Sequence, residues 1–97
     1  MIRSFGNKGT EDLFHGTTRT KAARRYPTTL HAAATARLQY LNAAVSLGDL
    51  RAPPSNHLEA LAGDLAGWHS IRVNQQWRII FQWTEGNADA VQIVDYH

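Results

Sequence analysis

The spacing of the hydrophobic residues changes near Trp68, and this change constrains the fold more than any other feature of the chain. Before it, apolar residues recur at steps of three and four, which is the spacing of one face of a helix. That stripe consists of Leu30, Ala34, Leu38, Leu41 and Val45. After Trp68, apolar and polar residues alternate as in half-buried strands. The two periods predict an α+β fold, with helices backing a small antiparallel sheet.

The first half of the chain is expected to hold one strand and two helices. A short strand at 1–5 precedes a short helix at 10–16, for which Thr10 is the predicted N-cap. Pro27 is expected to open the long helix, because proline suits the first turn. One further turn is expected after that helix. The paired prolines of 51–56 then predict an extended loop.

Three alternating stretches in the last third of the chain are expected to form antiparallel strands. They span 68–73, 77–83 and 90–96. Since cross-strand partners share a face of the sheet, burying both apolar sets of the first hairpin requires Ile71 opposite Ile79. The same rule places Ile93 near Ile79 and Val91 near Phe81. The predicted sheet therefore has one apolar face for the helices.

The predicted register sets two arginines against each other on the other face. Arg72 of the first strand lies opposite Arg78 of the second, and like charges in this position are unfavourable. Either an anion lies between them, or a solvated sheet edge tolerates both. The third strand brings Val94 and Tyr96 to the Arg78 side.

Size and composition limit the class of protein. Ninety-seven residues suffice for a single domain over residues 1–97. No apolar run approaches the roughly 18 to 20 residues that cross a membrane. The chain has no cysteine, which excludes a disulfide framework and a thiolate metal site. We expect a soluble cytoplasmic domain with no membrane contact.

Positive charge is concentrated near the N-terminus. Residues 1–25 carry six basic and two acidic side chains, 6 − 2 = +4, whereas the rest carries 4 − 6 = −2. The basic stretch 19–25 is either a phosphate-binding surface or a solvated loop. The candidate RNA-binding residues are Lys8, Lys21, Arg24, Arg25 and Arg72.

The remaining polar residues favour phosphodiester chemistry without a metal or other cofactor. The five histidines are scattered and form no i, i+4 pair with a nearby acid. No G-x-S-x-G nucleophile motif is present. In RNA the 2′-hydroxyl is a built-in nucleophile, so a protein need only move two protons and stabilise charge on phosphorus. Histidine, carboxylate and arginine side chains suit these tasks.

Three motifs resemble one protein family. The pattern "IRSF.NKG...LF", the pattern "L..L.GD..G..SI.V...WRI.F" and the ending "VDYH" are similar to those of HigB toxins (host inhibition of growth, or plasmid maintenance killer) of bacterial type II toxin–antitoxin modules. The likeness spans nearly the whole chain. It implies a RelE-like fold, in the order β-α-α-β-β-β, and an mRNA interferase that cuts the message in the ribosomal A site. It also implies a HigA-like helix-turn-helix antitoxin, through which alone the toxin would meet operator DNA.

The resemblance also implies roles for single residues. Arg78 matches the arginine that stabilises the scissile phosphate, and His97 matches the proton-transfer residue. Tyr96 would stack on or orient the nucleotide, and Asp95 would position its neighbours. Each of the last two has a structural alternative, in which Tyr96 caps the core and Asp95 pairs with an arginine. The three tryptophans are expected to pack in the core rather than to stack on bases.

One stretch departs from the family pattern. Where well-known members read "LHPLKGD", this chain reads "LEALAGD", so the family's histidine falls on Glu59 and its lysine on Ala62. Glu59 would serve as the base, or His57 would reach in, or Arg72 would replace the lost lysine charge. The rival hypothesis is a binding module that has lost cleavage and holds RNA or an acidic partner.

Overall fold

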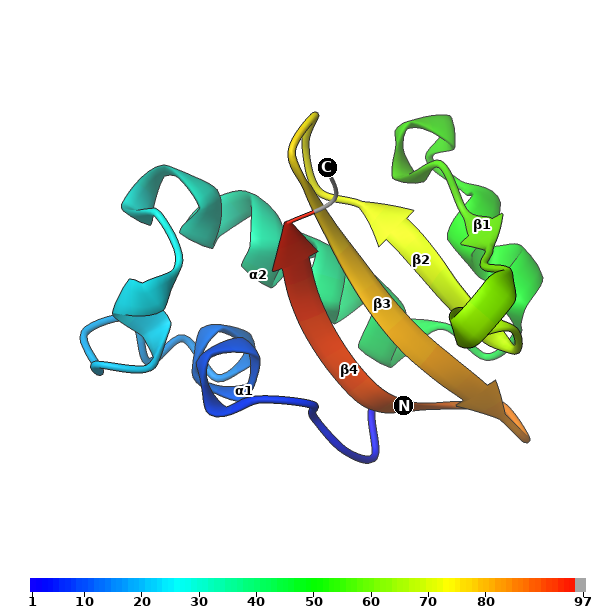
Figure 1. The fold of residues 1–97 in the computed structure, drawn as a ribbon, viewed down its shortest axis with the longest axis horizontal. Helices are drawn as coiled ribbons and strands as arrows, with labels where there is room; N and C mark the ends of the chain where they lie inside the picture. The colour runs from blue at the N-terminus through cyan, green and yellow to red at the C-terminus, as the bar shows by residue number, and fades with distance from the viewer. Residues whose placement is uncertain (96–97) are drawn as a thin grey trace.

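The computed structural model describes residues 1–95, which form a four-stranded antiparallel sheet with two helices on one face (Figure 1). The strand order is β1-β2-β3-β4, so strands that are neighbours in the chain are neighbours in the sheet. This arrangement confirms the predicted fold class. The elements are α1 (Lys8–Phe14), α2 (Thr28–Ala43), β1 (Glu59–Ala60), β2 (Trp68–Arg72), β3 (Trp77–Thr84) and β4 (Asn87–Asp95), with short 3₁₀ turns η1 (Ala23–Arg25), η2 (Leu47–Arg51), η3 (Pro54–Asn56) and η4 (Gly63–Leu65).

The register of the two long hairpins agrees with the sequence prediction. Ile71 pairs with Ile79, which in turn pairs with Ile93 of β4. Arg72 lies opposite Arg78, as the same register requires. Burial of the apolar sets therefore decides which polar side chains share the other face.

The strand β4 begins earlier than predicted and contains a β-bulge. The pairing steps from Ile80↔Gln92 to Gln82↔Asp89, and Ala90 within the shift has a positive φ of 53°. The extra residue lets β4 extend back to Asn87. The connecting turn consequently has two residues with positive φ, which is typical of tight hairpins.

The core lies between the apolar face of the sheet and the helices. Ile71, Ile79 and Phe81 are fully buried there and form one cluster with the apolar stripe of α2. Burying a side chain of this size contributes roughly 1.5–3 kcal/mol. Two of the tryptophans, Trp77 and Trp83, pack at the margin of the cluster, as expected for core residues.

The helix α2 ends two residues before the predicted stripe does. Val45 lies beyond the helix and is 79% exposed. The reason is local, because the Asp49 Oδ2 atom accepts hydrogen bonds from the backbone N–H groups of Val45 and Ser46 at 2.9 and 3.1 Å. This side chain competes with continuation of the helix. Within residues 1–95, no helix has the length and apolar character needed to cross a membrane.

The N-terminal segment differs from the prediction in two ways. Residues 1–5 do not form a regular strand but make two parallel bridges to β4, Ile2↔Ala88 and Phe5↔Val91. The N-cap of α1 is Asn7, whose side chain accepts from the backbone of Thr10 at 2.8 Å. The predicted cap, Thr10, instead uses its hydroxyl to accept from the Ile93 N–H of β4 at 3.0 Å.

Candidate active site

Arg78 is the centre of the candidate site. Its neighbour Ile79 packs in the core under the helices, so Arg78 points to the opposite face of the sheet. The arginine is only 7% exposed. Its Nε donates to the Ser70 Oγ atom at 2.9 Å, and its Nη2 donates to the His57 carbonyl oxygen at 2.6 Å. These contacts fix the guanidinium in one orientation within a largely buried site.

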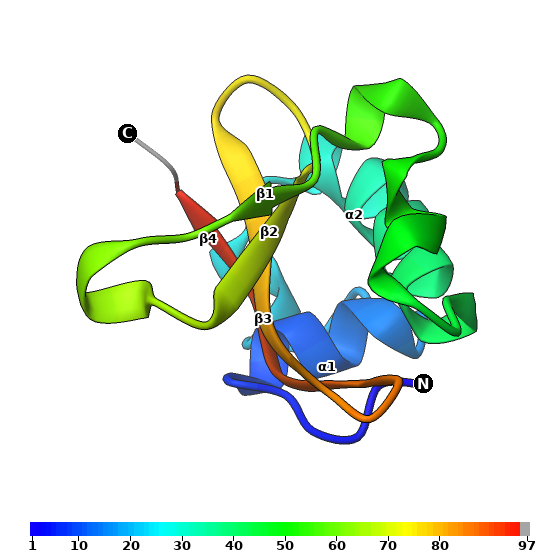
Figure 2. The same ribbon diagram turned by 90° about the vertical axis from the view of Figure 1, so that its right-hand side faces the viewer.

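A carboxylate lies beside this guanidinium. Glu59 of β1 pairs with Ser70 of β2, so both side chains share the Arg78 face. The Glu59 Oε1 atom is 3.8 Å from Arg78 Nη2, and the Glu59 side chain is 53% exposed. The 61–67 segment, which joins β1 to β2, stands out on this side of the sheet, away from α2 (Figure 2). The structure thus brings together two residues that are 19 positions apart in the chain.

The loop before β1 is held by a buried asparagine. Asn56 is fully buried, and its Nδ2 donates to the carbonyls of Leu50 and Ala52 at 3.2 and 3.3 Å. His57 follows with a left-handed backbone, φ 45°, and presents its carbonyl to Arg78. Its side chain is exposed. Sequence reasoning considered the His57 ring but missed this role of its backbone, for which no local sequence pattern exists.

The opposed arginines are accommodated by different acceptors. Arg72 turns back on the β2–β3 loop, where its Nε donates to the Asn74 carbonyl at 3.1 Å. Arg78 is buried against Ser70, His57 and Glu59. The solvated-edge explanation does not fit, because Arg78 is largely buried, whereas an anion between the two arginines stays a prediction.

The end of β4 lies beside the β2–β3 loop. Asp95 pairs with Trp77, and its Oδ2 accepts a hydrogen bond from Gln76 Nε2 at 3.0 Å. Val94 is directly opposite Arg78, as the sequence predicted. Tyr96 and His97, for which the sequence suggests catalytic roles, lie outside the described residues.

The predicted RNA-binding residues fall into separate groups. Lys8 is on α1 and forms ion pairs with Asp12 and Glu11 at 3.2 and 3.5 Å. The hydrogen bond to Asp12 raises the pKa of Lys8. In contrast, Lys21, Arg24 and Arg25 are exposed and have no hydrogen bond or ion pair from their side chains within residues 1–95. The structure does not gather these cations around Arg78.

The chemistry available at this face is that of an anion site next to a base. A guanidinium with fixed orientation can fork onto two phosphate oxygens, and a nearby carboxylate can accept a proton. No three side chains of the metal-ligand types gather at one point within residues 1–95. Arg78 and Glu59 give this face an anion-binding group and a proton acceptor.

Comparisons with known proteins match this fold and length. A family model of the RelE-like toxins called HigB, from type II toxin–antitoxin systems, matches residues 3–97. Toxin HigB-1 of Vibrio cholerae serotype O1 is 42% identical over 88 residues, which cover 91% of this chain and 90% of the relative. Endoribonuclease HigB of Proteus vulgaris is 36% identical over 98 residues and matches over 100% of both chains.

Two solved structures share the architecture at low sequence identity. YafQ from E. coli aligns with a TM-score of 0.59 and 17% identity, over 98% of this chain and 91% of that chain. A YoeB/ParE toxin from Agrobacterium tumefaciens aligns with a TM-score of 0.54 and 16% identity, over 98% and 99% of the two chains. These likenesses show the fold, which is RelE-like.

Proposed function

This chain belongs to the HigB toxins of type II toxin–antitoxin systems, and we propose that it is an endoribonuclease that cleaves mRNA on the ribosome. The relative from Proteus vulgaris is named an endoribonuclease, which supports the activity. A family of this type also implies an antitoxin partner. We propose that this partner is a HigA-like helix-turn-helix protein, and that the toxin reaches operator DNA only through it.

The observation that carries the proposal is the fixed, nearly buried guanidinium of Arg78. Its Nε and Nη2 are held by Ser70 and by the His57 carbonyl. A charge that is oriented in advance and shielded from water stabilises the extra negative charge of a phosphorane more strongly than a mobile one. In this proposal, Arg78 binds the scissile phosphate.

We propose that Glu59 is the general base. Its carboxylate is 3.8 Å from Arg78 Nη2, so a phosphate bound by Arg78 would lie within reach of it. Glu59 removes the proton of the 2′-hydroxyl, and the 2′-oxygen attacks phosphorus. The bond from phosphorus to the 5′-oxygen breaks, and His97 gives that oxygen a proton. The products are a 2′,3′-cyclic phosphate and a 5′-hydroxyl, with no metal involved.

Glu59 is preferred over His57 as the base, and Arg72 is not preferred as the replacement for the family lysine, because of the contacts that His57 and Arg72 make. His57 serves Arg78 through its carbonyl oxygen, and its backbone is held by the turn that Asn56 anchors. Arg72 donates from Nε to the β2–β3 loop. Asp95, hydrogen-bonded to Gln76 on that loop, would hold the end of β4 so that Tyr96 orients the nucleotide.

Primer extension on an mRNA in a reconstituted translation reaction tests the activity. The untagged protein should cut within A-site codons, and deletion of His97, Arg78→Ala and Glu59→Gln should each abolish or strongly reduce the cuts. Equal cutting by the wild type and Glu59→Gln would move the base to His57. Ribosome binding and thermal unfolding of each variant show whether it is folded.

A binding module without cleavage remains the second candidate, and one observation favours it. Ala62, where the family lysine is expected, is exposed and lies just before η4, so no cation extends from this position. If the wild type leaves every message intact while it still binds ribosomes, the endoribonuclease proposal is wrong and the binding module is correct.

A further inference from the structure

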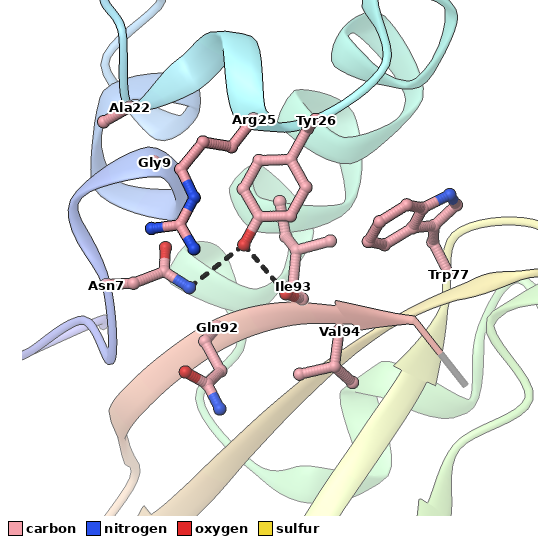
Figure 3. A pocket seen from close by; sticks show the side chains of 9 residues that line it. All are labelled: Asn7, Gly9, Ala22, Arg25, Tyr26, Trp77, Gln92, Ile93 and Val94. Atoms are coloured by element: carbon pink, nitrogen blue, oxygen red, sulfur yellow. Dashed lines mark hydrogen bonds between the residues drawn. The ribbon is translucent and has the colours of Figure 1, made fainter. Parts of the chain in front are cut away.

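A second candidate site lies at the outer edge of β4. A pocket of about 290 Å³ opens there between β4, the start of α1 and η1 (Figure 3). Its volume is near the lower end of the range for small-molecule sites, about 300 Å³. This is room for one nucleotide or a similarly small group. The lining includes Asn7, Ala22, Arg25, Trp77, Gln92 and Val94.

The inner wall of the pocket is already saturated with hydrogen bonds. The Tyr26 hydroxyl donates to the Ile93 carbonyl at 2.8 Å and accepts from Asn7 Nδ2 at 3.0 Å. The Asn7 Oδ1 atom accepts from the Thr10 N–H. These groups tie η1 and α1 to β4, so they make a fixed wall and leave little capacity for a ligand.

Two polar side chains of the lining remain for a ligand. Arg25 and Gln92 make no side-chain hydrogen bond to any residue in the described part of the chain. Arg25 comes from η1 and hangs beside Asn7, whereas Gln92 comes from β4 (Figure 3). A guanidinium attracts phosphate, and an amide both donates and accepts, as the edge of a nucleobase requires.

The apolar part of the lining suits a planar ring. Trp77 is half-buried, with its ring at 80° to that of Tyr26 and the ring centroids 5.5 Å apart. Val94 lines the pocket from the neighbouring strand. Nucleobases bind tryptophan in this way because every base has an apolar face and a polar edge.

The pocket is continuous with the Arg78 face. Val94 is the cross-strand partner of Arg78 and also lines the pocket. Figure 3 shows Gln92 and Val94 on one side of β4, and Tyr26 and Trp77 on the other. A strand of RNA whose phosphate lies on Arg78 therefore has a short path over the edge of β4 into the pocket.

We propose that this pocket binds the nucleotide next to the pair that the scissile phosphate joins, with its base against Trp77 and its phosphate on Arg25. The proposal rests on the proposed RNA cleavage and adds a substrate subsite to it. An acidic segment of a protein partner would use Arg25, but it would not need an aromatic wall or the amide of Gln92. The lining therefore favours RNA.

Binding of two non-cleavable RNAs to the full chain tests the subsite. The probes are a fluorescein-labelled dinucleotide and a hexanucleotide, both with 2′-O-methyl riboses, measured by fluorescence anisotropy. Ala22→Phe, which fills the pocket, should weaken hexanucleotide binding by about tenfold, the loss expected for one stacked base. Arg25→Gln should also weaken it, because it removes the charge that holds the phosphate. Dinucleotide binding should not change. Arg24→Gln is the matched control, because it removes the same charge from the same turn without touching the pocket.

Three outcomes would overturn the subsite. They are no gain in wild-type affinity from dinucleotide to hexanucleotide, an equal loss for Arg24→Gln and Arg25→Gln, and a loss of affinity for the purified antitoxin rather than for RNA. Cleavage on the ribosome is measured separately. If Arg78→Ala loses the cuts but the pocket variants neither lose them nor bind RNA more weakly, the proposed activity stands and the subsite is wrong. If the pocket variants bind RNA more weakly but the wild type makes no cuts, the subsite stands and the proposed activity is wrong.

Discussion

The two faces of the sheet are built from the same strands but are held by different forces. On the helix side, side chains such as Ile79 and Phe81 are buried in a cluster of many apolar residues. On the other side, Arg78 is buried nearly as deeply, yet its position depends on the Ser70 hydroxyl, the His57 carbonyl and Glu59.

The difference separates stability from chemistry. Hydrophobic contacts are numerous and non-directional, so the helix side gains free energy without fixing any one polar group. Hydrogen bonds to a charged group are few and directional, so they fix the orientation of the Arg78 guanidinium. This fixed orientation costs the free energy of removing a cation from water. Substitutions on the two faces should therefore affect different measurements.

The largest expected effect on the helix side comes from Phe81→Ala. Phe81 is fully buried, and such truncation costs roughly 3–5 kcal/mol through lost transfer energy and the cavity that remains. Urea unfolding should show this loss. Gln82→Ala, an exposed neighbour on the same strand, should change the free energy of unfolding by less than about 0.5 kcal/mol. A similar loss in both variants would contradict the division between the faces.

Arg78→Lys should have the largest effect on the other face. Lysine keeps the charge but cannot donate from Nε to Ser70 while a second nitrogen holds the His57 carbonyl. Cleavage should fall by about 10²–10³-fold, the usual loss for a fixed charge stabiliser. Single-turnover cleavage on programmed ribosomes measures this effect. Full activity in Arg78→Lys would mean that charge alone, without orientation, suffices.

Asn56→Ala should have an intermediate effect on both measurements. Its amide is fully buried and holds the Leu50 and Ala52 carbonyls, and leaving such groups without a partner costs about 1–3 kcal/mol. The turn also carries His57, whose carbonyl contacts Arg78, so Asn56→Ala should also reduce cleavage. The reduction should be larger than in Phe81→Leu, a control variant that destabilises the protein without changing this turn. Equal activity in the two variants would show that the turn does not position Arg78.

Acid should lower the folding stability through two carboxylates, one on the helix side and one at the edge of β4. Each of them is expected to contribute less than the residues above. The hydrogen bond from Thr20 at 2.6 Å lowers the pKa of Asp12, and Arg3 lowers the pKa of Asp89. A carboxyl whose folded pKa is lowered stabilises the protein above its unfolded pKa, about 3.9, and this contribution is lost as the pH falls through the folded value.

Thermal unfolding between pH 6 and pH 2 checks this sign, with both limits about two units from the unfolded value. The midpoint should fall below about pH 4, and Asp12→Asn should reduce the fall. Asp64→Asn is the matched control, since this exposed carboxylate has no hydrogen bond or ion pair within residues 1–95. If Asp64→Asn flattens the profile as much as Asp12→Asn does, the assignment to Asp12 is wrong.

The sheet could be predicted because its register follows from burial alone. Two alternating strands with a short loop leave one pairing that buries both apolar sets, and this fixed Arg72 opposite Arg78. The apolar stripe of α2 was predicted as far as Leu41, because burial of one helix face also follows from the spacing of apolar residues. Its end was not, because Asp49 side-chain bonds stop the helix before Val45.

The missed features depend on contacts between distant residues. Thr10 has the sequence signal of an N-cap but bonds to Ile93, which is 83 residues away. β1 has two residues, too few for any periodicity, so the approach of Glu59 to Arg78 could not be predicted from it. The family resemblance aligned Glu59 with a catalytic position, but only the fold brings its carboxylate beside the guanidinium.

The pairing of the N-terminal segment with β4 has a consequence for how the molecule is made. Arg3 N–H donates to the Ala88 carbonyl at 2.8 Å, and the Arg3 side chain forms an ion pair with Asp89. Contacts between such distant residues form slowly and only when both partners exist. The first five residues can therefore form these contacts only after nearly the whole chain has been synthesised. The toxin completes its fold only after a ribosome has translated its last strand.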